Sequence, residues 1–334
     1  MKTRIGLIGC GGRMNIHINS IGLMDDVEVV AIADPVEKNR IKASTTFPNA
    51  RVYENHTALY DAESKETLDC VFIAIEPTAH TDTETRAIEM GIPFLVEKPM
   101  TLDLDLADEI AAKVKEKNLV TAVGFQDRYL DLIEMIKDEL PNHKPGGLVY
   151  SAWIGGIPGV WWWQKKSTCG AQLVEQNIHL LDGLRFLYGE AKSIYATYSR
   201  GINVVGTDTS AEYDTDDHST AVICFENGVT ATLVSGCFSK NRDACSPSGM
   251  VITMSDITFD YRLRNNLITK TAGKITDVKR GVDQNYLLAK DFIKAVKLGD
   301  PTIVRSPYED GLKSLKLAFA ANQSMETGEV IYFN

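Results

Sequence analysis

The stretch "IGLIGCGGRM", from Ile5 to Met14, decides the fold class of the first part of this chain. Gly9, Gly11 and Gly12 directly follow a strand-like apolar run and precede a helical stretch. In that setting a glycine-rich turn brings backbone amides close to a pyrophosphate at a helix N-terminus. A second apolar run ends about twenty residues later at Asp34, where a carboxylate can accept hydrogen bonds from an adenosine ribose. The combination predicts a dinucleotide-binding site.

Two further features bear on that site. Met14 stands where the fingerprint usually has a third glycine or alanine, so helix-to-strand packing must accommodate a larger side chain. Asp34 is followed by Pro35 and has no adjacent arginine, which disfavours a 2′-phosphate and favours NAD. Lys38 and Arg40 keep NADP as an alternative. The structural alternative is a tight strand-to-helix turn that binds no ligand.

Apolar runs alternate with amphipathic segments as far as about Thr121. Such alternation predicts a doubly wound parallel sheet, an N-terminal Rossmann domain over residues 1–124. A helix is expected after the fifth strand, with Thr101 as its cap and Asp103 and Asp105 in its first turn. The runs that carry the prediction are RIGLIG, VEVVAIAD, LDCVFIAI, IPFLVE and LVTAVGF.

Beyond Gly124 the pattern changes to strands that follow one another with turn signals between them, which predicts antiparallel pairing. Two helices are expected to close the chain, one from Val282 and one beginning at Ser306 and Pro307. We therefore expect residues 125–334 to form an α+β domain with a large, mostly antiparallel open sheet, whose C-terminal helix is free to pack back on the first domain. The strands are SAWIGG, HSTAVICF, VTATLVSGCF and DITFDYRL.

Composition narrows the class of partner. The chain has 45 acidic and 35 basic residues, a net charge of -10, which repels a nucleic-acid backbone. No apolar run is long enough for a membrane helix, and the N-terminal run does not resemble a signal peptide or an anchor. Six cysteines without a CxxC pair suit reduced thiols, so a cytoplasmic location is expected.

The stretch "FLVEKPM" ends the predicted strand IPFLVE with Glu97, Lys98 and Pro99. The carboxyl ends of strands in an open α/β sheet are where ligands bind. Pro99 keeps Lys98 out of helical geometry, with the peptide bond between them either trans or cis. A lysine held there can stabilise charge that develops on a hydroxyl or carbonyl oxygen. The alternative is a strand-end lysine that simply reaches solvent.

Taken together, the motifs resemble the Gfo/Idh/MocA oxidoreductases over nearly the whole chain. The motifs are "GCGG", "EPTAH" with His80, "EKP", "GFQDRY", and a helix with His179 and Asp182. The resemblance implies a Rossmann domain, a second domain whose open sheet mediates assembly into dimers or tetramers, a bound nicotinamide, and sugar or cyclitol substrates. The cofactor contacts it implies are Gly9, Cys10, Gly11, Gly12, Arg13, Met14, Asp34, Ile75, Pro77, His80, Glu97, Lys98 and Gln126.

The stretch "GAQLVEQNIHLLDGLRFLYG", from Gly170 to Gly189, is expected to form one helix with Glu175, His179 and Asp182 on a single stripe. A metal site lacks a recognisable motif such as HExxH, and no metal is expected. A buried structural histidine is the second alternative. The resemblance favours acid–base catalysis, with His179 as base, Lys98 on the same oxygen, and Glu175 tuning the pair. Many relatives have aspartate at the position of Glu175.

Three tryptophans, Trp161 to Trp163, precede that helix and can stack on sugar rings, although core or interface packing is the commoner use of tryptophan. Lys165 and Lys166 follow. They either favour the binding of an acidic sugar or are simply exposed to solvent. The acidic segment over residues 201–217 is expected to be a loop, either a lid, a partner contact or a surface loop without function. The expected substrate contacts are Lys98, Arg128, Trp162, Trp163, Gln176, His179 and Asp182.

Three classes of function remain at this stage. The first is an NAD-dependent dehydrogenase or reductase for a secondary hydroxyl or ketone of a sugar, cyclitol or glycoside. The second is a redox-neutral glycosidase that uses the same cofactor and accumulates no NADH. The third is a regulator that keeps the dinucleotide fold without catalysis, which the presence of Lys98 and His179 disfavours.

Overall fold

The computed structural model describes residues 2–144, 147–241 and 248–333. The chain divides into two units: unit 1 comprises Met1–Tyr129 and Asp283–Leu312, and unit 2 comprises Leu130–Val282 and Lys313–Asn334. Cys245 lies outside the described residues, and the other five cysteines are free. Within the described ranges, no helix combines the length and the apolar character that a membrane crossing requires.

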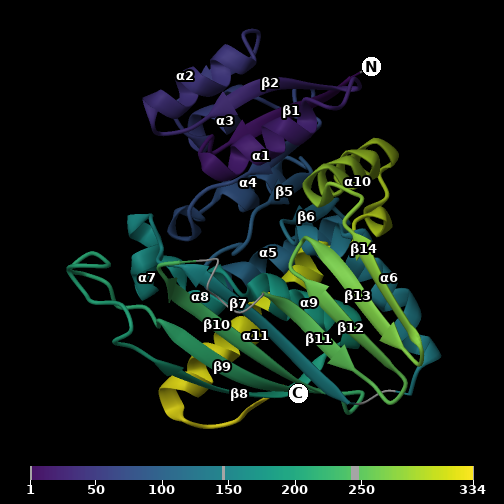
Figure 1. Ribbon diagram of the computed structural model, residues 1–334. Coiled ribbons are helices and arrows are strands. Elements are labelled where there is room, and N and C mark those ends of the chain that lie inside the picture. The colour runs from purple at the N-terminus through teal and green to yellow at the C-terminus, as the bar shows by residue number, and fades with distance from the viewer. Residues whose placement is uncertain (1, 145–146, 242–247, 334) are drawn as a thin grey trace. The chain divides into compact units, whose positions relative to one another are not determined.

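Unit 1 is built on six parallel strands in the order β3-β2-β1-β4-β5-β6 (Figure 1). This confirms the predicted doubly wound parallel sheet. The central strands are buried along nearly their whole length because helices cover both faces. The strands are β1 (Thr3–Ile8), β2 (Val27–Ala33), β3 (Arg51–Tyr53), β4 (Cys70–Ile73), β5 (Phe94–Val96) and β6 (Thr121–Val123).

The helices of unit 1 come from both ends of the chain. Leu288 and Phe292 of α10 join a buried core with Ile5, Leu7 and Met14. Met14 is fully buried there, so the larger side chain that the fingerprint position carries is accommodated in the core. The helices are α1 (Gly12–Ile21), α2 (Glu37–Thr46), α3 (His56–Ala62), η1 (Pro77–Ala79), α4 (Thr83–Glu89), α5 (Leu104–Lys117), η2 (Gln126–Tyr129), α10 (Gln284–Leu298), η6 (Pro301–Ile303) and the start of α11 (Tyr308–Thr327).

The start of α5 corrects one prediction. Asp103, not Thr101, is the cap: its carboxylate accepts hydrogen bonds from the backbone N–H groups of Asp105 at 3.0 Å and Leu106 at 3.1 Å. The Thr101 hydroxyl instead accepts from the backbone N–H of Asp103 at 3.1 Å. A carboxylate reaches two orphan donors of the first turn, so it outcompetes the threonine two residues earlier.

Unit 2 is built on nine strands in the order β14-β13-β12-β11-β7-β10-β9-β8-β15, with α9 against one face (Figure 1). Among the described strands of this nine-stranded sheet, only β7 and β10 pair in parallel, which confirms a mostly antiparallel sheet. The strands are β7 (Leu148–Gly156), β8 (Ala191–Ser199), β9 (His218–Phe225), β10 (Thr230–Ser239), β11 (Gly249–Thr253), β12 (Ile257–Arg262), β13 (Asn266–Thr271), β14 (Lys274–Lys279) and β15 (Ile331–Tyr332).

The helices of unit 2 include two where the sequence predicted one. The backbone N–H of Asn177 donates to the carbonyl of Gln172 at 3.1 Å, five residues back, and this wide turn ends α8 before α9 begins. Glu175 therefore lies in α8, whereas His179 and Asp182 lie one turn apart in α9, and the single continuous helix expected over this segment is wrong. The helices are α6 (Asp131–Glu139), η3 (Leu140–Asn142), η4 (Trp161–Gln164), α7 (Lys166–Cys169), α8 (Gln172–Glu175), α9 (Ile178–Tyr188) and the rest of α11.

Helix α9 is enclosed by other parts of unit 2 in its first two turns. Every residue of α9 from Ile178 to Arg185 is buried. The helix packs on β7 and β10 of the sheet and on α6, so it has no solvent face in its first two turns. Polar groups in these turns must therefore find partners inside the protein.

Candidate functional site

The glycine turn of unit 1 lies between β1 and α1. Gly9 has φ +79°, and an added Cβ would stand 2.4 Å from the carbonyl oxygen of Ala74, so only glycine fits there. Gly11 and Gly12 differ, because an added Cβ at either position would meet no atom within 4 Å. The backbone at the start of α1 is thus open to a ligand, which fits a pyrophosphate at a helix N-terminus.

The carboxylate of Asp34 lies beside this turn and is 4% exposed. One oxygen accepts from the backbone N–H of Cys10 at 2.6 Å, and the other accepts from Val36 at 2.7 Å. Asn39 Nδ2 also donates to both oxygens, at 3.3 and 3.2 Å, so a ribose hydroxyl would bind this carboxylate by replacing the long Asn39 contact. Arg40 donates to the carbonyl oxygens of Asp34 and Pro35 at 2.7 and 3.1 Å. Burial, together with Asp34, raises the pKa of the Cys10 thiol to about 12, so that thiol stays protonated.

Three of the expected cofactor residues form one cluster in unit 1. Arg13 Nε pairs with Glu97 Oε1 at 2.7 Å, and Arg13 Nη2 donates to Gln126 Oε1 at 3.2 Å. His17 Nε2 lies 2.7 Å from the same Glu97 oxygen. Burial opposes ionisation of Glu97, but Arg13 and His17 outweigh it and lower the pKa of Glu97 to about 2. The cluster fixes the chain where β5 ends.

Lys98 follows Glu97 at the carboxyl end of β5, and its peptide bond to Pro99 is cis. The backbone is crowded here: a Cβ on Gly124, after β6, would stand 2.4 Å from the Glu97 carboxylate. The ends of two neighbouring strands therefore pack closely at the edge where open α/β sheets bind ligands.

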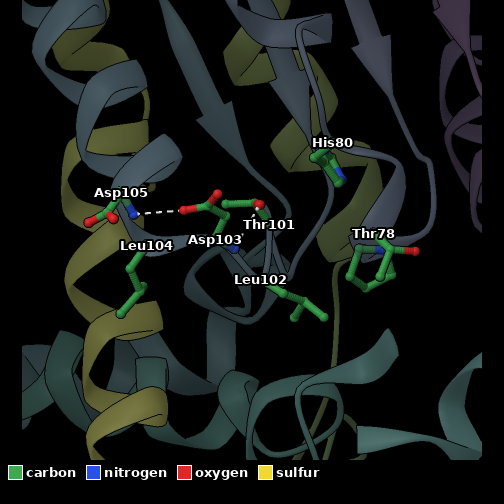
Figure 2. Close-up of a pocket in the computed structure, with 8 residues that line it drawn as sticks. Thr78, His80, Thr101, Leu102, Asp103, Leu104 and Asp105 are labelled. Carbon is green, nitrogen blue, oxygen red and sulfur yellow. Dashed lines mark hydrogen bonds between the residues drawn. The ribbon is translucent and has the colours of Figure 1, made fainter. Parts of the chain in front are cut away.

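An open pocket of about 560 Å³ lies in unit 1 between the segments that follow β4 and β5 (Figure 2). It includes Pro77 and His80, two expected cofactor contacts, whereas Ile75 lies nearer the turn, with its Cγ2 close to Gly9. His80 Nδ1 and Glu84 Oε1 are 2.6 Å apart, and both side chains are buried. The lining residues are Pro77, Thr78, His80, Thr101, Leu102, Asp103, Leu104 and Asp105.

In unit 2, the ring of His179 stacks on the indole of Trp153 from β7, with centroids 6.0 Å apart and planes 28° from parallel. His179 and Glu175 are each 6% exposed. Arg264 lies over the same indole, with its guanidinium carbon 5.2 Å from the ring centroid. Trp153 thus restricts the orientation of the imidazole and places a cation near it.

The neighbours of His179 bind mainly other parts of unit 2. Asp182 is 1% exposed and accepts from the Ser314 hydroxyl of α11 at 2.6 Å. Gln176 donates to the carbonyl of Trp153 at 3.3 Å, and its Oε1 lies 2.9 Å from the Cys237 sulfur. These contacts tie α8 and α9 to α11 and to the sheet, and substrate contact by Asp182 or Gln176 stays a prediction.

The remaining expected contacts differ in surroundings. Trp162 and Trp163 are half-buried and stacked on each other, with centroids 6.3 Å apart, whereas Trp161 is 62% exposed. Arg128 is buried in unit 1, where it donates to the carbonyl of Arg305 at 2.8 Å and pairs with Asp310 at 2.5 Å. Lys165 pairs with Glu212, an arrangement that satisfies this lysine without substrate.

Among the described residues, no group of three or more histidine, cysteine, aspartate or glutamate side chains is arranged to hold a metal ion. Sequence reasoning also missed three residues that shape the site: Trp153, Gln172 and Gly124. Trp153 and Gln172 sit in apolar runs without a motif, and their roles come from cross-strand and loop contacts. Gly124 had a signal, since a glycine ending a buried strand often marks close approach of another group.

Comparison with known proteins places these features in a family. The family model described as an oxidoreductase family with an NAD-binding Rossmann fold matches residues 3–125. The model for the GFO/IDH/MocA C-terminal domain matches residues 148–256. The two matches together span more than half of the chain.

Individual relatives are distant. Myo-inositol 2-dehydrogenase of Thermotoga maritima is 23% identical over 339 residues, covering 97% of this chain and 96% of that protein. The rhizopine catabolism protein MocA of Rhizobium meliloti is 24% identical over 192 residues, which span 57% of this chain and only 58% of MocA. Levoglucosan dehydrogenase, solved in complex with NADH and L-sorbose, is similar in fold, with a TM-score of 0.87, 19% identity and 100% of each chain covered.

The open backbone of the glycine turn, the buried carboxylate of Asp34 and the six-stranded parallel sheet agree with the first family model. Strands β7 to β11 of the nine-stranded sheet lie in the residues that the second model matches. The chain belongs to the GFO/IDH/MocA family of oxidoreductases with an NAD-binding Rossmann domain.

Proposed function

We propose that this protein is a dehydrogenase that transfers hydride between the nicotinamide of NAD and a secondary alcohol or ketone of a sugar, cyclitol or glycoside. The observation that carries the proposal is the position of Lys98. It directly follows the Arg13–Glu97 pair at the carboxyl end of β5, on the edge of the sheet where the glycine turn also lies. Relatives and fold neighbours named as inositol and levoglucosan dehydrogenases support the substrate class.

In the proposed mechanism, the chain binds, orients and moves a proton. NAD, when bound, supplies the redox chemistry as a hydride acceptor. Lys98 donates a hydrogen bond to the reacting oxygen and stabilises the negative charge that develops there. His179 takes the hydroxyl proton, since histidine titrates near neutral pH and its ring is oriented by Trp153. Glu175 acts on the pair through its charge.

The first experiment is a spectrophotometric screen with NAD against inositols, hexoses, hexuronates and nitrophenyl glycosides. A dehydrogenase accumulates NADH. Release of nitrophenol without net NADH would instead identify the redox-neutral glycosidase, which uses the same residues. If neither NADH nor nitrophenol forms with any compound, although calorimetry shows that the protein binds NAD, the result would favour a regulator and contradict the proposal.

The second experiment tests the assigned roles with the best substrate. His179→Ala and Lys98→Met should each lower kcat by about 10²- to 10⁴-fold, and NAD affinity should stay close to that of the wild type in His179→Ala. His143→Ala is a matched control, because His143 pairs with Glu139 and Asp256 at the surface of unit 2. If His179→Ala retains most of the turnover at neutral pH, the base is another group.

A further variant tests whether Glu175 acts on the base through its charge. Glu175→Gln keeps the size of the side chain and removes the charge. Loss of the charge should lower the apparent pKa of the base in the kcat profile, because a nearby carboxylate favours the protonated imidazole. An unchanged profile would limit Glu175 to a structural role.

We also infer that the protein assembles into a dimer or tetramer through the outer face of the nine-stranded sheet. Three exposed side chains lie in register on that face: Tyr195 of β8, Val222 of β9 and Tyr150 of β7, which are 42%, 39% and 36% exposed, with Thr232 of β10 between the last two. Exposed apolar and aromatic side chains gathered on one face of a sheet are typical of an interface. Sedimentation of the wild type and of Tyr150→Lys tests this, and a wild-type monomer at all concentrations would contradict it.

A cytoplasmic location is inferred from the cysteines. The five in the described part of the chain are free, and four of them are buried. Titration of the unfolded, unreduced protein should count all six thiols of the sequence. A lower count would indicate disulfides and an oxidising compartment.

A further inference from the structure

The acidic loop over residues 201–217, between β8 and β9, lies beside α7 (Figure 1). It contacts the tryptophan segment that precedes α7 through backbone groups. Ser210 N donates to Gln164 Oε1 at 2.7 Å, and Asp214 N donates to the carbonyl of Gln164 at 3.2 Å. The backbone N–H of Lys166 donates to Asp214 Oδ1 at 2.6 Å. Three hydrogen bonds thus hold the loop against Gln164 and Lys166, so it is not a loose lid.

Gln172, the first residue of α8, joins the loop to a tryptophan ring. Its side chain is fully buried. Its Oε1 accepts from the indole Nε1 of Trp163 at 2.8 Å, and its Nε2 donates to the Thr215 hydroxyl at 3.0 Å. Its backbone N–H donates to Asp216 Oδ1 at 3.2 Å. One amide side chain therefore bridges the indole and the loop with both of its polar atoms in use.

The chain before Gln172 is held in a costly conformation. Ala171 has φ +74° and ψ 173°, a region that is nearly restricted to glycine and costs about 1–3 kcal/mol. Asn322 of α11 donates to the adjacent carbonyl of Gly170 at 2.7 Å. Such a conformation persists where its surroundings determine it on several sides, and here it directs Gln172 toward Trp163 and Thr215.

The loop end that carries Thr215 is itself anchored. Asp217 is fully buried and accepts from the backbone N–H of Ile202 at 2.8 Å, from Asn203 Nδ2 at 2.6 Å and from the Tyr213 hydroxyl at 2.7 Å. Both ends of the loop therefore converge on one carboxylate. A loop fixed in this way gives Gln172 a rigid partner.

We propose that Gln172 is a positioning residue that holds the indole of Trp163 against the 201–217 loop and so sets the aromatic wall that selects the substrate ring. Trp163 is stacked in parallel with Trp162, so fixing one indole fixes the pair. A rigid pair of aromatic faces favours a cyclic substrate with an apolar C–H face over an open-chain polyol. The selection of a cyclic substrate rests on the proposed dehydrogenase function, whereas the bridge from Gln172 to Trp163 and the loop does not.

The structural test observes the indole directly. Indole ¹H–¹⁵N spectra of the full chain should contain four signals, one per tryptophan, and Trp163→Phe assigns that of Trp163. In Gln172→Leu, the Trp163 signal should move upfield in the proton dimension and its proton should exchange faster. The signal of the stacked Trp162 should shift less, and that of Trp153 should stay in place. Thr215→Val, nearly isosteric, should produce a smaller shift of the same signal.

The kinetic test compares cyclic and open-chain probes, myo-inositol or the best cyclic substrate of the screen against sorbitol. Gln172→Leu should raise KM for the cyclic probe about five- to tenfold, the value of one or two hydrogen bonds, with NAD affinity unchanged. The preference of the enzyme for the cyclic probe over sorbitol, measured as the ratio of their kcat/KM values, should fall by the same factor. Glu212→Gln is the matched control in the same loop, because Glu212 is exposed and only pairs with Lys165.

Several outcomes overturn the proposal. An unmoved Trp163 signal in both Gln172→Leu and Thr215→Val contradicts the bridge. A shifted signal with equal losses on cyclic and open-chain probes contradicts the role in selection. If Gln172→Leu does not fold, Thr215→Val carries the indole readout, and Thr215→Val and Trp163→Phe together carry the kinetic one. Failure of the dehydrogenase proposal would appear as no NADH from any probe, and the indole spectra would still test the bridge.

Discussion

His17 Nε2 and Glu97 Oε1 lie 2.7 Å apart, and both side chains are buried. Glu97 directly precedes Lys98 in the chain. Since Glu97 is ionised, it accepts the hydrogen bond and His17 Nε2 carries the proton. Arg13 from the first turn of α1 pairs with the same oxygen. A helix that begins at the glycine turn is thereby bonded to the strand end that presents the proposed catalytic lysine.

This cluster predicts an acid-dependent loss of stability. The pKa of Glu97 is about 2 in the folded state against an ordinary 4.5, so its stabilisation is complete above pH 4.5 and is lost as the pH falls toward 2. Glu97→Gln should lower the free energy of unfolding by about 3 kcal/mol at neutral pH. The difference from the wild type in thermal denaturation should shrink below pH 4.5. Glu109→Gln, which breaks an exposed pair with Lys113, should change little, and a pH-independent difference would contradict the assignment.

The glycine turn predicts that two neighbouring glycines have separable roles. Gly9→Ala should destabilise the fold, by about 1–3 kcal/mol from backbone strain alone, because its added Cβ also meets the Ala74 carbonyl. Gly12→Ala should leave the melting temperature nearly unchanged, because its Cβ enters open space. It should nevertheless weaken NAD binding by at least about tenfold, some 1.4 kcal/mol, by occupying the approach of the pyrophosphate. Calorimetric titration and thermal denaturation of both variants check this, and full NAD affinity in Gly12→Ala would place the pyrophosphate elsewhere.

Asp34 predicts the choice of dinucleotide. Its buried carboxylate should repel a 2′-phosphate, so NAD should bind more tightly than NADP. Asp34→Ser should weaken NAD by about 10- to 100-fold, since hydrogen bonds to a charged group contribute about 1.5–3 kcal/mol, and should narrow the gap to NADP. Isothermal titration with both dinucleotides measures this, with the exposed Glu37→Gln as control. Tighter binding of NADP to the wild type would show that Arg40 and not Asp34 governs the choice.

The stack of His179 on Trp153 predicts a role for a residue outside every motif. Trp153→Leu should lower kcat by up to about tenfold, because an aromatic pair is worth about 0.5–1.5 kcal/mol of orientation. Trp153→Phe, which retains a ring, should recover most of that loss. Steady-state kinetics at several pH values provide the measurement, and equal kcat in all three proteins would mean that other contacts orient the imidazole.

Much of unit 1 could be predicted from the sequence because its signals are local. The glycine turn, the β-branched runs and the aspartate ending β2 each depend on a few consecutive residues. The cap of α5 shows the limit: Thr101 and Asp103 are both good caps, and only the backbone geometry decides between them. Conflicts between equally suitable neighbours are settled by which side chain reaches the free N–H groups.

The segment from Gly170 to Gly189 could not be predicted in the same way. Its helical periodicity is correct on each side of Gln176 and Asn177, but both amides bond to the sheet, Gln176 to the Trp153 carbonyl and Asn177 to Ser235. Those partners lie more than twenty residues away in the chain, so no window of sequence contains them. The break in the helix is a tertiary effect.

The sequence by itself determined the fold class and the dinucleotide turn, because these signals depend on residue type and short spacing. It proposed Lys98 and His179 as candidate groups through the resemblance of the whole set of motifs to a family. Only the tertiary structure decided that Trp153 stacks on His179, that Glu97 is ionised between Arg13 and His17, and that Gln172 joins Trp163 to a distant loop. Each of these depends on which buried polar or aromatic group meets which partner. In a close-packed interior, residues far apart in the chain settle that choice together.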